Sequence, residues 1–258
     1  MQRRDILLGI GIAISGCLGT SENNKYEPDL DPFDGYPPLP LKVPPKQFFD
    51  PTTFDVAKVN SQTIPLAPLK TVYNWHQRGE ARFVDSRSQT QYERSHILGS
   101  ILSPAPSGIG SSDPTFDWPK NDRIVAYCGC PLHLSTLRAA SLLNSEFTNV
   151  YVLQDGFWDW HDKRYPLAGN DLNIAPRIWI IHGKTDPSLS GKTVWIRELQ
   201  SGQVEATMIQ TNGEFKSDIR FSNISPTTPI SIEAPHRTIV RPLSSLIDTT
   251  IEKFKKID

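Results

Sequence analysis

The sequence predicts an α/β domain with a mainly parallel sheet flanked by helices, followed by an all-β sandwich. Between residues 61 and 170, short apolar segments alternate with helical ones, as in strands joined by helical crossovers. From residue 171 to 258 the segments are short and several alternate apolar with polar side chains, which is typical of an antiparallel sandwich. This change of pattern places a domain boundary near residue 170.

The α/β segment opens with a helical pattern, LAPLKTVYNWHQRG, that ends at Gly79. The strands expected after it are ARFVD, SILSP, DRIVAYC and NVYVL, and the helical segments are SQTQYERS, STLRAASLLNS (with Ser135 as N-cap) and GFWDWHDK. Asp85 and Cys128 each end one of these strands. Because sites in parallel sheets form at the carboxyl ends of strands, both residues are candidates for a site.

The C-terminal segment contains the strand-like runs KTVWIREL, VEATMIQT, EFKSDIRF, PISIEA and HRTIVRPL, with turns at Gly202 and at Asn212 and Gly213. Its stretch SGKTVWIRELQSGQVEATMIQTNGEF resembles transthyretin-like or carboxypeptidase-regulatory-like sandwiches of surface proteins. That resemblance implies a structural or partner-binding module, with a protein partner for the sandwich and no catalytic residue in it.

The N-terminal segment, residues 1–17, has the order of an export signal. Arg3 and Arg4 precede an apolar run that is too short to span about 30 Å of hydrocarbon. The paired arginines resemble a twin-arginine signal, and the small residues before Cys17 resemble a lipoprotein box. These resemblances imply lipidation of Cys17 and attachment to the extracytoplasmic face of the cell membrane. The alternative is a buried first helix with an unmodified cysteine.

Residues 18–60 are expected to form a tether, because eight prolines between residues 20 and 53 disfavour helix and central strand. The whole chain has 258 residues, of which 38% are hydrophobic and 21% charged, with a net charge of -1 and a pI near 6.6. This composition is globular, and it gives no reason to expect nucleic acid as a partner.

The cysteines point to chemistry rather than to a disulfide framework. If Cys17 carries lipid, only Cys128 and Cys130 remain, separated by a single residue. Loop N–H groups and the positive end of the following helix favour a thiolate at Cys128 and lower its pKa. The expected active loop comprises Gly129, Cys130, Pro131, Leu132, His133, Leu134 and Ser135.

Three motifs in this segment resemble those of a rhodanese-like (sulfurtransferase) domain. FVDSRSQTQYERSHILGSI carries the matching positions Asp85, Arg87, Tyr92, Glu93, His96, Ile97 and Gly99. IVAYC resembles the strand that ends in the family's nucleophile, here Cys128, and NVYVLQDGFWDWHDKRYPL keeps Gly156 and Trp160 of the closing motif. Order and spacing of all three agree between residues 61 and 170.

The resemblance implies a sulfurtransferase that needs neither cofactor nor metal. Cys128 takes a sulfane sulfur from a donor as a persulfide and passes it to a thiol acceptor, while Asp85 and Arg87 support the loop. His96 is expected to have a structural hydrogen-bonding role. The loop lacks the Lys or Arg of the common family loop, which leaves the donor open.

Other chemistries fit the sequence less well. A phosphatase needs Cys-x5-Arg, but Leu134 and Thr136 occupy that position relative to Cys128 and Cys130. Cys130 could resolve a persulfide, form a strained and easily reduced disulfide with Cys128, bind a soft metal together with Cys128 and His133, or simply pack. A non-catalytic binding module on the same fold is the remaining alternative.

Overall fold

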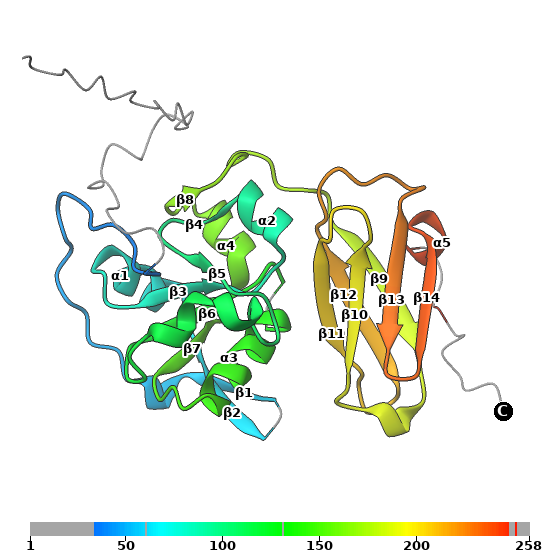
Figure 1. The fold of residues 1–258 in the computed structure, drawn as a ribbon, viewed down its shortest axis with the longest axis horizontal. Coiled ribbons are helices and arrows are strands. Elements are labelled where there is room, and N and C mark those ends of the chain that lie inside the picture. Colours follow the sequence, from blue (N-terminus) through cyan, green and yellow to red (C-terminus); the bar gives the residue numbers. More distant parts are fainter. Residues whose placement is uncertain (1–33, 60, 131, 248–250, 252–258) are drawn as a thin grey trace, which may run out of the picture.

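The computed structural model describes residues 34–59, 61–130, 132–247 and 251, which form an α/β lobe and a β lobe lying side by side (Figure 1). Cys17, with the whole expected signal segment, and Pro131 lie outside the described residues. No helix in the described part of the chain is long and apolar enough to cross a membrane.

The α/β lobe is built on a six-stranded sheet with the order β1-β2-β7-β6-β3-β5. All neighbours are parallel except β1 and β2, which form a hairpin. This hairpin extends the sheet upstream of residue 61, the expected start of the domain. The strands are β1 Asp55–Val59, β2 Gln62–Ala67, β3 Arg82–Asp85, β5 Ile101–Leu102, β6 Ile124–Tyr127 and β7 Val150–Leu153. A separate small pair joins β4 His96–Ile97 to β8 Leu167–Ala168.

Two apolar cores lie on the two faces of this sheet. On β6, Val125 and Tyr127 belong to one core and Ile124 and Ala126 to the other, because successive strand residues point to opposite faces. Helix α3 packs on one face, and α1 and α4 pack on the other. The helices are α1 Leu69–Gln77, α2 Gln89–Arg94, α3 Leu134–Asn144 and α4 Gly156–Asp162, with 3-10 turns at Pro51–Thr53, Gly110–Ser112 and Pro114–Asp117.

The C-terminal lobe consists of antiparallel sheets around one core, as the sequence predicted. The first sheet has the order β11-β10-β13-β14 and the second pairs β12 with β9. Apolar side chains from both sheets meet in this core, among them Ile181, Ile196, Phe215 and Ile232. The elements are β9 Trp179–Lys184, β10 Thr193–Glu198, β11 Val204–Met208, β12 Glu214–Ile219, β13 Pro229–Ala234, β14 Arg237–Pro242, a 3-10 turn Pro187–Leu189 and α5 Ser244–Ile247.

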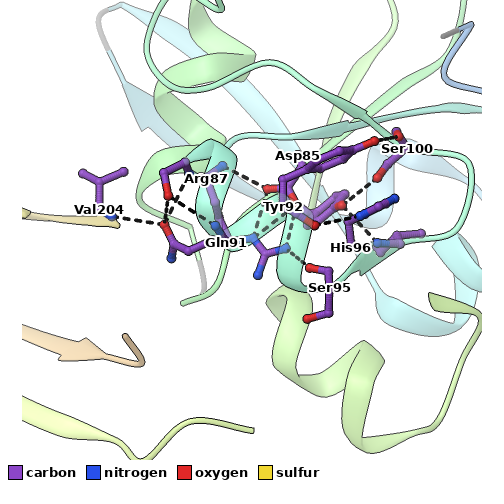
Figure 2. Close-up of polar contacts among 11 residues, drawn as sticks. Asp85, Arg87, Gln91, Tyr92, Ser95, His96, Ser100 and Val204 are labelled. Atoms are coloured by element: carbon purple, nitrogen blue, oxygen red, sulfur yellow. Dashed lines mark hydrogen bonds and ion pairs between the residues drawn. The ribbon is translucent and has the colours of Figure 1, made fainter. Parts of the chain in front are cut away.

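Edge strand β11 contacts the α/β lobe. Gln91, the partner of the N-cap Ser88 in the capping box of α2, accepts a hydrogen bond from the Val204 backbone N–H at 3.1 Å through the same Oε1 that bonds Ser88 (Figure 2). Val204 and Ala206 also share an apolar cluster with Cys128 and Leu134. The β lobe is thereby packed onto the residues at the carboxyl edge of the parallel sheet.

Candidate active site

Cys128 follows directly after β6, whose four residues are all buried. Its side chain is 1% exposed, and its Sγ lies 3.2 Å from Ser135 Oγ and 2.8 Å from the carbonyl oxygen of Cys130. The loop returns over the thiol before α3 begins at Leu134. The sulfur is therefore held at the carboxyl edge of the sheet, against the N-terminus of α3.

Apart from the Cys130 carbonyl oxygen, which can only accept, the hydrogen-bonding groups around Cys128 favour its thiolate. Burial alone raises the pKa of a thiol, because it disfavours the charged form. Hydrogen bonds from the side chains of Cys130 and Ser135 and from the backbone N–H groups of Ser135 and His133 outweigh burial, and lower the pKa of Cys128 to about 7. A thiol with that pKa is substantially ionised at neutral pH and is a competent nucleophile.

The start of α3 differs from the expected position by two residues. Its N-cap is His133 rather than Ser135, because Leu132 takes a left-handed conformation with φ of 77° and turns the chain into the helix early. Ser135 thus lies within the first turn, where its hydroxyl contacts Cys128 instead of capping the helix. Leu134 is fully buried beside the cysteine.

The turn between β7 and α4 supports the loop from the other side. Phe157 N–H donates to the Cys128 carbonyl at 2.9 Å. Gly156 has φ of 78°, and a Cβ there would lie 3.3 Å from the Gly129 oxygen and 3.4 Å from the Cys128 oxygen. A side chain at position 156 would therefore combine a disfavoured backbone conformation with close contacts to the active loop.

Asp85 and Arg87 form a buried ion pair beside the loop (Figure 2). Arg87 Nη2 lies 2.6 Å from Asp85 Oδ2 and donates to the Ser95 carbonyl at 2.7 Å, and the guanidinium stacks over Phe157 at 4.0 Å. Burial works against the charge of Arg87, but Asp85 keeps its pKa above the ordinary value. This arginine is close to the loop, yet its charge is already matched by Asp85.

The remaining motif residues have structural roles. His96 Nδ1 lies 2.8 Å from the Tyr92 carbonyl oxygen, and Tyr92 donates its hydroxyl to the Ser100 carbonyl at 2.7 Å (Figure 2). Trp160 is fully buried in the core. Arg138 is paired with Asp113 at 3.1 Å, so its guanidinium is not placed to grip a phosphate at Cys128.

The β lobe contributes a residue that the sequence did not identify. Glu205, on β11, is 1% exposed, and its Oε2 accepts a hydrogen bond from Cys130 Sγ at 3.2 Å. A Cβ on Gly129 would lie 2.6 Å from Glu205 Oε1, so the carboxyl rests against the loop. The sandwich, in which the sequence analysis named no site residue, therefore contacts the active loop. The residues around Glu205 have an ordinary strand pattern, which carries no signal for a contact 75 positions away.

Both described cysteines are free thiols. Within residues 34–59, 61–130, 132–247 and 251, no group of three or more His, Cys, Asp or Glu side chains is arranged to hold a metal ion. His133 Nδ1 lies 3.3 Å from Cys130 Sγ, so the side chains of these two loop residues contact each other. The loop is organised by hydrogen bonds between its own side chains and those of β11.

A cavity of about 190 Å³ opens between the lobes next to the loop. His133, Thr136 and Leu137 line it from the α/β lobe, and Ala206 and Thr207 line it from the β lobe. A larger, polar cavity of about 510 Å³ lies farther along the same junction, near Thr90 and Gln203. Neither cavity is lined by Cys128, so a reactant needs some movement of the loop or of β11 to reach the thiol.

The fold and site define a class of protein: a parallel α/β domain with a low-pKa cysteine at the end of a central strand, supported by a buried Asp–Arg pair. Residues 69–163 match the family model of the rhodanese-like domain. The chain therefore contains a rhodanese-like domain, as its motifs predicted, together with a C-terminal all-β lobe.

The chain is similar to several solved structures at low identity. A Bacillus halodurans protein is 23% identical, with a TM-score of 0.37 over 42% of this chain and 83% of its own. The rhodanese-like domain of an Anabaena sp. protein is 19% identical, with a TM-score of 0.36 over 44% and 92%. A rhodanese with anions from E. coli is 22% identical, with a TM-score of 0.29 over 35% and 99%. No curated protein sequence matches the chain.

Proposed function

We propose that this protein is a sulfurtransferase that carries sulfane sulfur as a persulfide on Cys128. The observation that carries the proposal is the environment of that thiol: it ends a central strand, faces a helix N-terminus, and has its pKa lowered to about 7 by surrounding hydrogen bonds. A core cysteine that only fills space has no need of these donors, because burial raises its pKa.

The chemistry balances without a cofactor or metal. The Cys128 thiolate attacks the outer sulfur of a hydropersulfide, RSSH, which forms Cys128–S–SH and releases RS⁻. A second thiolate, R′S⁻, then attacks the outer sulfur of the persulfide, forming R′SSH and restoring the Cys128 thiolate. The backbone N–H groups at the start of α3 stabilise the anionic sulfur at each stage.

The charges near the loop favour a hydropersulfide over thiosulfate as donor. Positions 129–135 contain no Lys or Arg, and the nearby Arg87 is already neutralised by Asp85. Glu205 adds a carboxyl that can only repel a dianion when it is ionised. A hydropersulfide donor with an uncharged organic group needs no cation in the loop and is not repelled by an ionised Glu205.

We expect the full chain to be loaded at least about tenfold faster by the hydropersulfide of 2-mercaptoethanol than by thiosulfate at equal concentration. The measurement is the rate at which intact protein gains the mass of one sulfur atom. Equal rates, or faster loading by thiosulfate, would contradict the proposed donor class. Absence of the added mass with either donor would contradict the sulfurtransferase itself.

One observation favours a second candidate, a rhodanese-fold module that binds rather than transfers. Cys128 is only 1% exposed, because Val204 and Ala206 of β11 pack over it. Under this candidate, which includes thiol-redox and soft-metal binding by Cys128 and Cys130, the lobes stay closed and no sulfur is carried. The donor experiment above separates the two candidates.

We further propose that residues 1–17 are an export signal and that Cys17 carries lipid, which holds the protein on the extracytoplasmic face of the membrane. The support is the order of arginines, apolar run, small residues and cysteine in the sequence. Cys17→Ser is expected to move most of the protein from the membrane fraction to the soluble fraction. An unchanged distribution between the membrane and soluble fractions would contradict the lipid anchor.

A protein partner for the β lobe remains an expectation from its resemblance to surface modules.

A further inference from the structure

Glu205 is a buried carboxyl without a cationic partner. Its side chain is 1% exposed, and no ion pair joins it to any Lys, Arg or His of the described residues. A buried carboxylate of this kind is costly unless it is paired or protonated. Its hydrogen bond is to Cys130, the second residue after Cys128. A group of this type at the edge of a reactive cysteine needs an explanation.

Cys130 lies between Glu205 and Cys128. Glu205 Oε2 lies 3.2 Å from Cys130 Sγ, Cys128 Sγ lies 2.8 Å from the Cys130 carbonyl oxygen, and the Cys130 side chain lowers the pKa of Cys128. Cys130 has a single S–H, so it can donate to Glu205 or to Cys128 but not to both at once. The position of that proton therefore depends on which of the two groups is ionised.

The charges agree with this coupling. Burial, and then the charge of Cys128, raise the pKa of Glu205 to about 8, against the lowering effects of Cys130 and Arg87. The hydrogen bond to Cys128, burial and the Glu205 charge raise the pKa of Cys130 well above its ordinary value. When Cys128 is a thiolate, Cys130 remains a thiol and Glu205 holds a proton.

We infer that Glu205, supplied by the β lobe, takes up and returns the protons of the thiols that exchange sulfur at Cys128, with the Cys130 S–H relaying them. This inference rests on the proposed function and adds to it an acid–base group from outside the rhodanese-like domain. It also gives the β lobe a chemical role, because removing that lobe removes the group.

The proton balance closes over both half-reactions. During loading, the released RS⁻ takes the proton of the Glu205 carboxylic acid and leaves as RSH. During discharge, the Glu205 carboxylate takes the proton of the acceptor R′SH, whose thiolate attacks Cys128–S–SH. The products are R′SSH, the Cys128 thiolate and protonated Glu205, which is the starting state.

Other ionisable groups face the same region. From the α/β lobe, Arg87 lowers and Asp85 raises the pKa of Glu205. His133 contacts Cys130, but burial lowers its pKa even though Asp218 of β12 opposes the shift. His133 is therefore neutral where Cys128 reacts, and Glu205 is the group whose ionisation lies near that of Cys128.

The test loads wild type and Glu205→Gln with the hydropersulfide of 2-mercaptoethanol and follows discharge to two acceptors. One acceptor is 2-mercaptoethanol, which must lose a proton. The other is a neutral tertiary phosphine, which has none to lose and takes the sulfur as phosphine sulfide. We expect Glu205→Gln to slow discharge to the thiol by about a hundredfold, and discharge to the phosphine by less than about threefold.

The pH profile gives an independent readout. In wild type, discharge to the thiol is expected to rise with pH through the Glu205 ionisation, because the carboxylate is the base. This rise should lie below pH 8, since the persulfide lacks the Cys128 charge that helps to raise the pKa of Glu205 to about 8. In Glu205→Gln this rise disappears, and the discharge rate depends on pH only through the fraction of 2-mercaptoethanol that is ionised in solution. A matched control is Glu214→Gln, an exposed glutamate of the same lobe on β12, which should leave both acceptors unaffected.

The outcomes separate the inference from the proposed function. Failure of wild type to load sulfur contradicts the sulfurtransferase and with it this inference. If both proteins load, and Glu205→Gln discharges to the thiol as fast as wild type, the inference alone is overturned. Equal slowing with thiol and phosphine would assign Glu205 a purely structural role and would also overturn it. Thermal melting checks that the variant is folded, as expected because Gln keeps the shape without a charge to bury.

Discussion

Replacing Cys128 with serine is expected to abolish sulfur transfer, with a fall in turnover of at least about a thousandfold. A serine hydroxyl has a far higher pKa than a thiol and cannot form a persulfide. The hydrogen bonds at the start of α3 would then have no anionic sulfur to stabilise. The measurement is steady-state transfer from a hydropersulfide to a thiol. Residual transfer close to wild type would mean that another group carries the sulfur.

Cys130→Ser is the companion variant, because it separates sulfur transfer from dithiol chemistry. Serine keeps a hydrogen-bond donor between Cys128 and Glu205, so persulfide formation on Cys128 should persist at a reduced rate. A disulfide oxidoreductase using both cysteines predicts the opposite. Loss of activity in Cys130→Ser as complete as in Cys128→Ser would favour that chemistry.

Asp85→Ala is expected to destabilise the protein by about 3–5 kcal/mol, since removal of one partner leaves the other charge buried and unpaired. The Asp85 and Arg87 side chains are 0% and 2% exposed, so water cannot replace the lost carboxylate. The pair also anchors the backbone of the segment beside the loop through the Ser95 carbonyl. Urea unfolding monitored by circular dichroism measures the change.

The matched control for Asp85→Ala is Glu214→Ala. Glu214 pairs with Lys184 at 3.5 Å on the surface of the β lobe, where both side chains are about half exposed. Exposed pairs of this kind contribute about 0–1 kcal/mol. A loss at Asp85 no larger than at Glu214 would mean that the buried pair does not organise the loop.

The fold of the rhodanese-like domain could be predicted because its signals are local. Buried strands such as Ile124–Tyr127 are continuous apolar runs, and the motif residues Asp85, Arg87 and Gly156 lie at or next to the ends of strands and helices. The β1–β2 hairpin was not expected, because its residues follow a proline-rich segment and β2 itself contains Pro65. Pro65 is tolerated because β2 pairs with β7 only at Leu66 and Ala67, so the β7 ladder does not include position 65.

The candidate site could be predicted only in part. The sequence identifies Cys128 and its loop, since a cysteine between a strand and a helix is visible as a pattern. It cannot show that β11 packs over the loop, because that contact depends on how two separate lobes dock. Glu205 alternates with apolar neighbours like any strand residue, so the three-dimensional structure is needed to connect it with Cys130.

The most direct test of the central claim is the mass of the protein after exposure to a sulfane-sulfur donor. The full chain is treated with the hydropersulfide of 2-mercaptoethanol, desalted, and examined intact and after proteolysis. The persulfide mechanism predicts one added sulfur atom, located on Cys128 and removed by a thiol acceptor. An unmodified Cys128, or a Cys128–Cys130 disulfide as the only product, would contradict it.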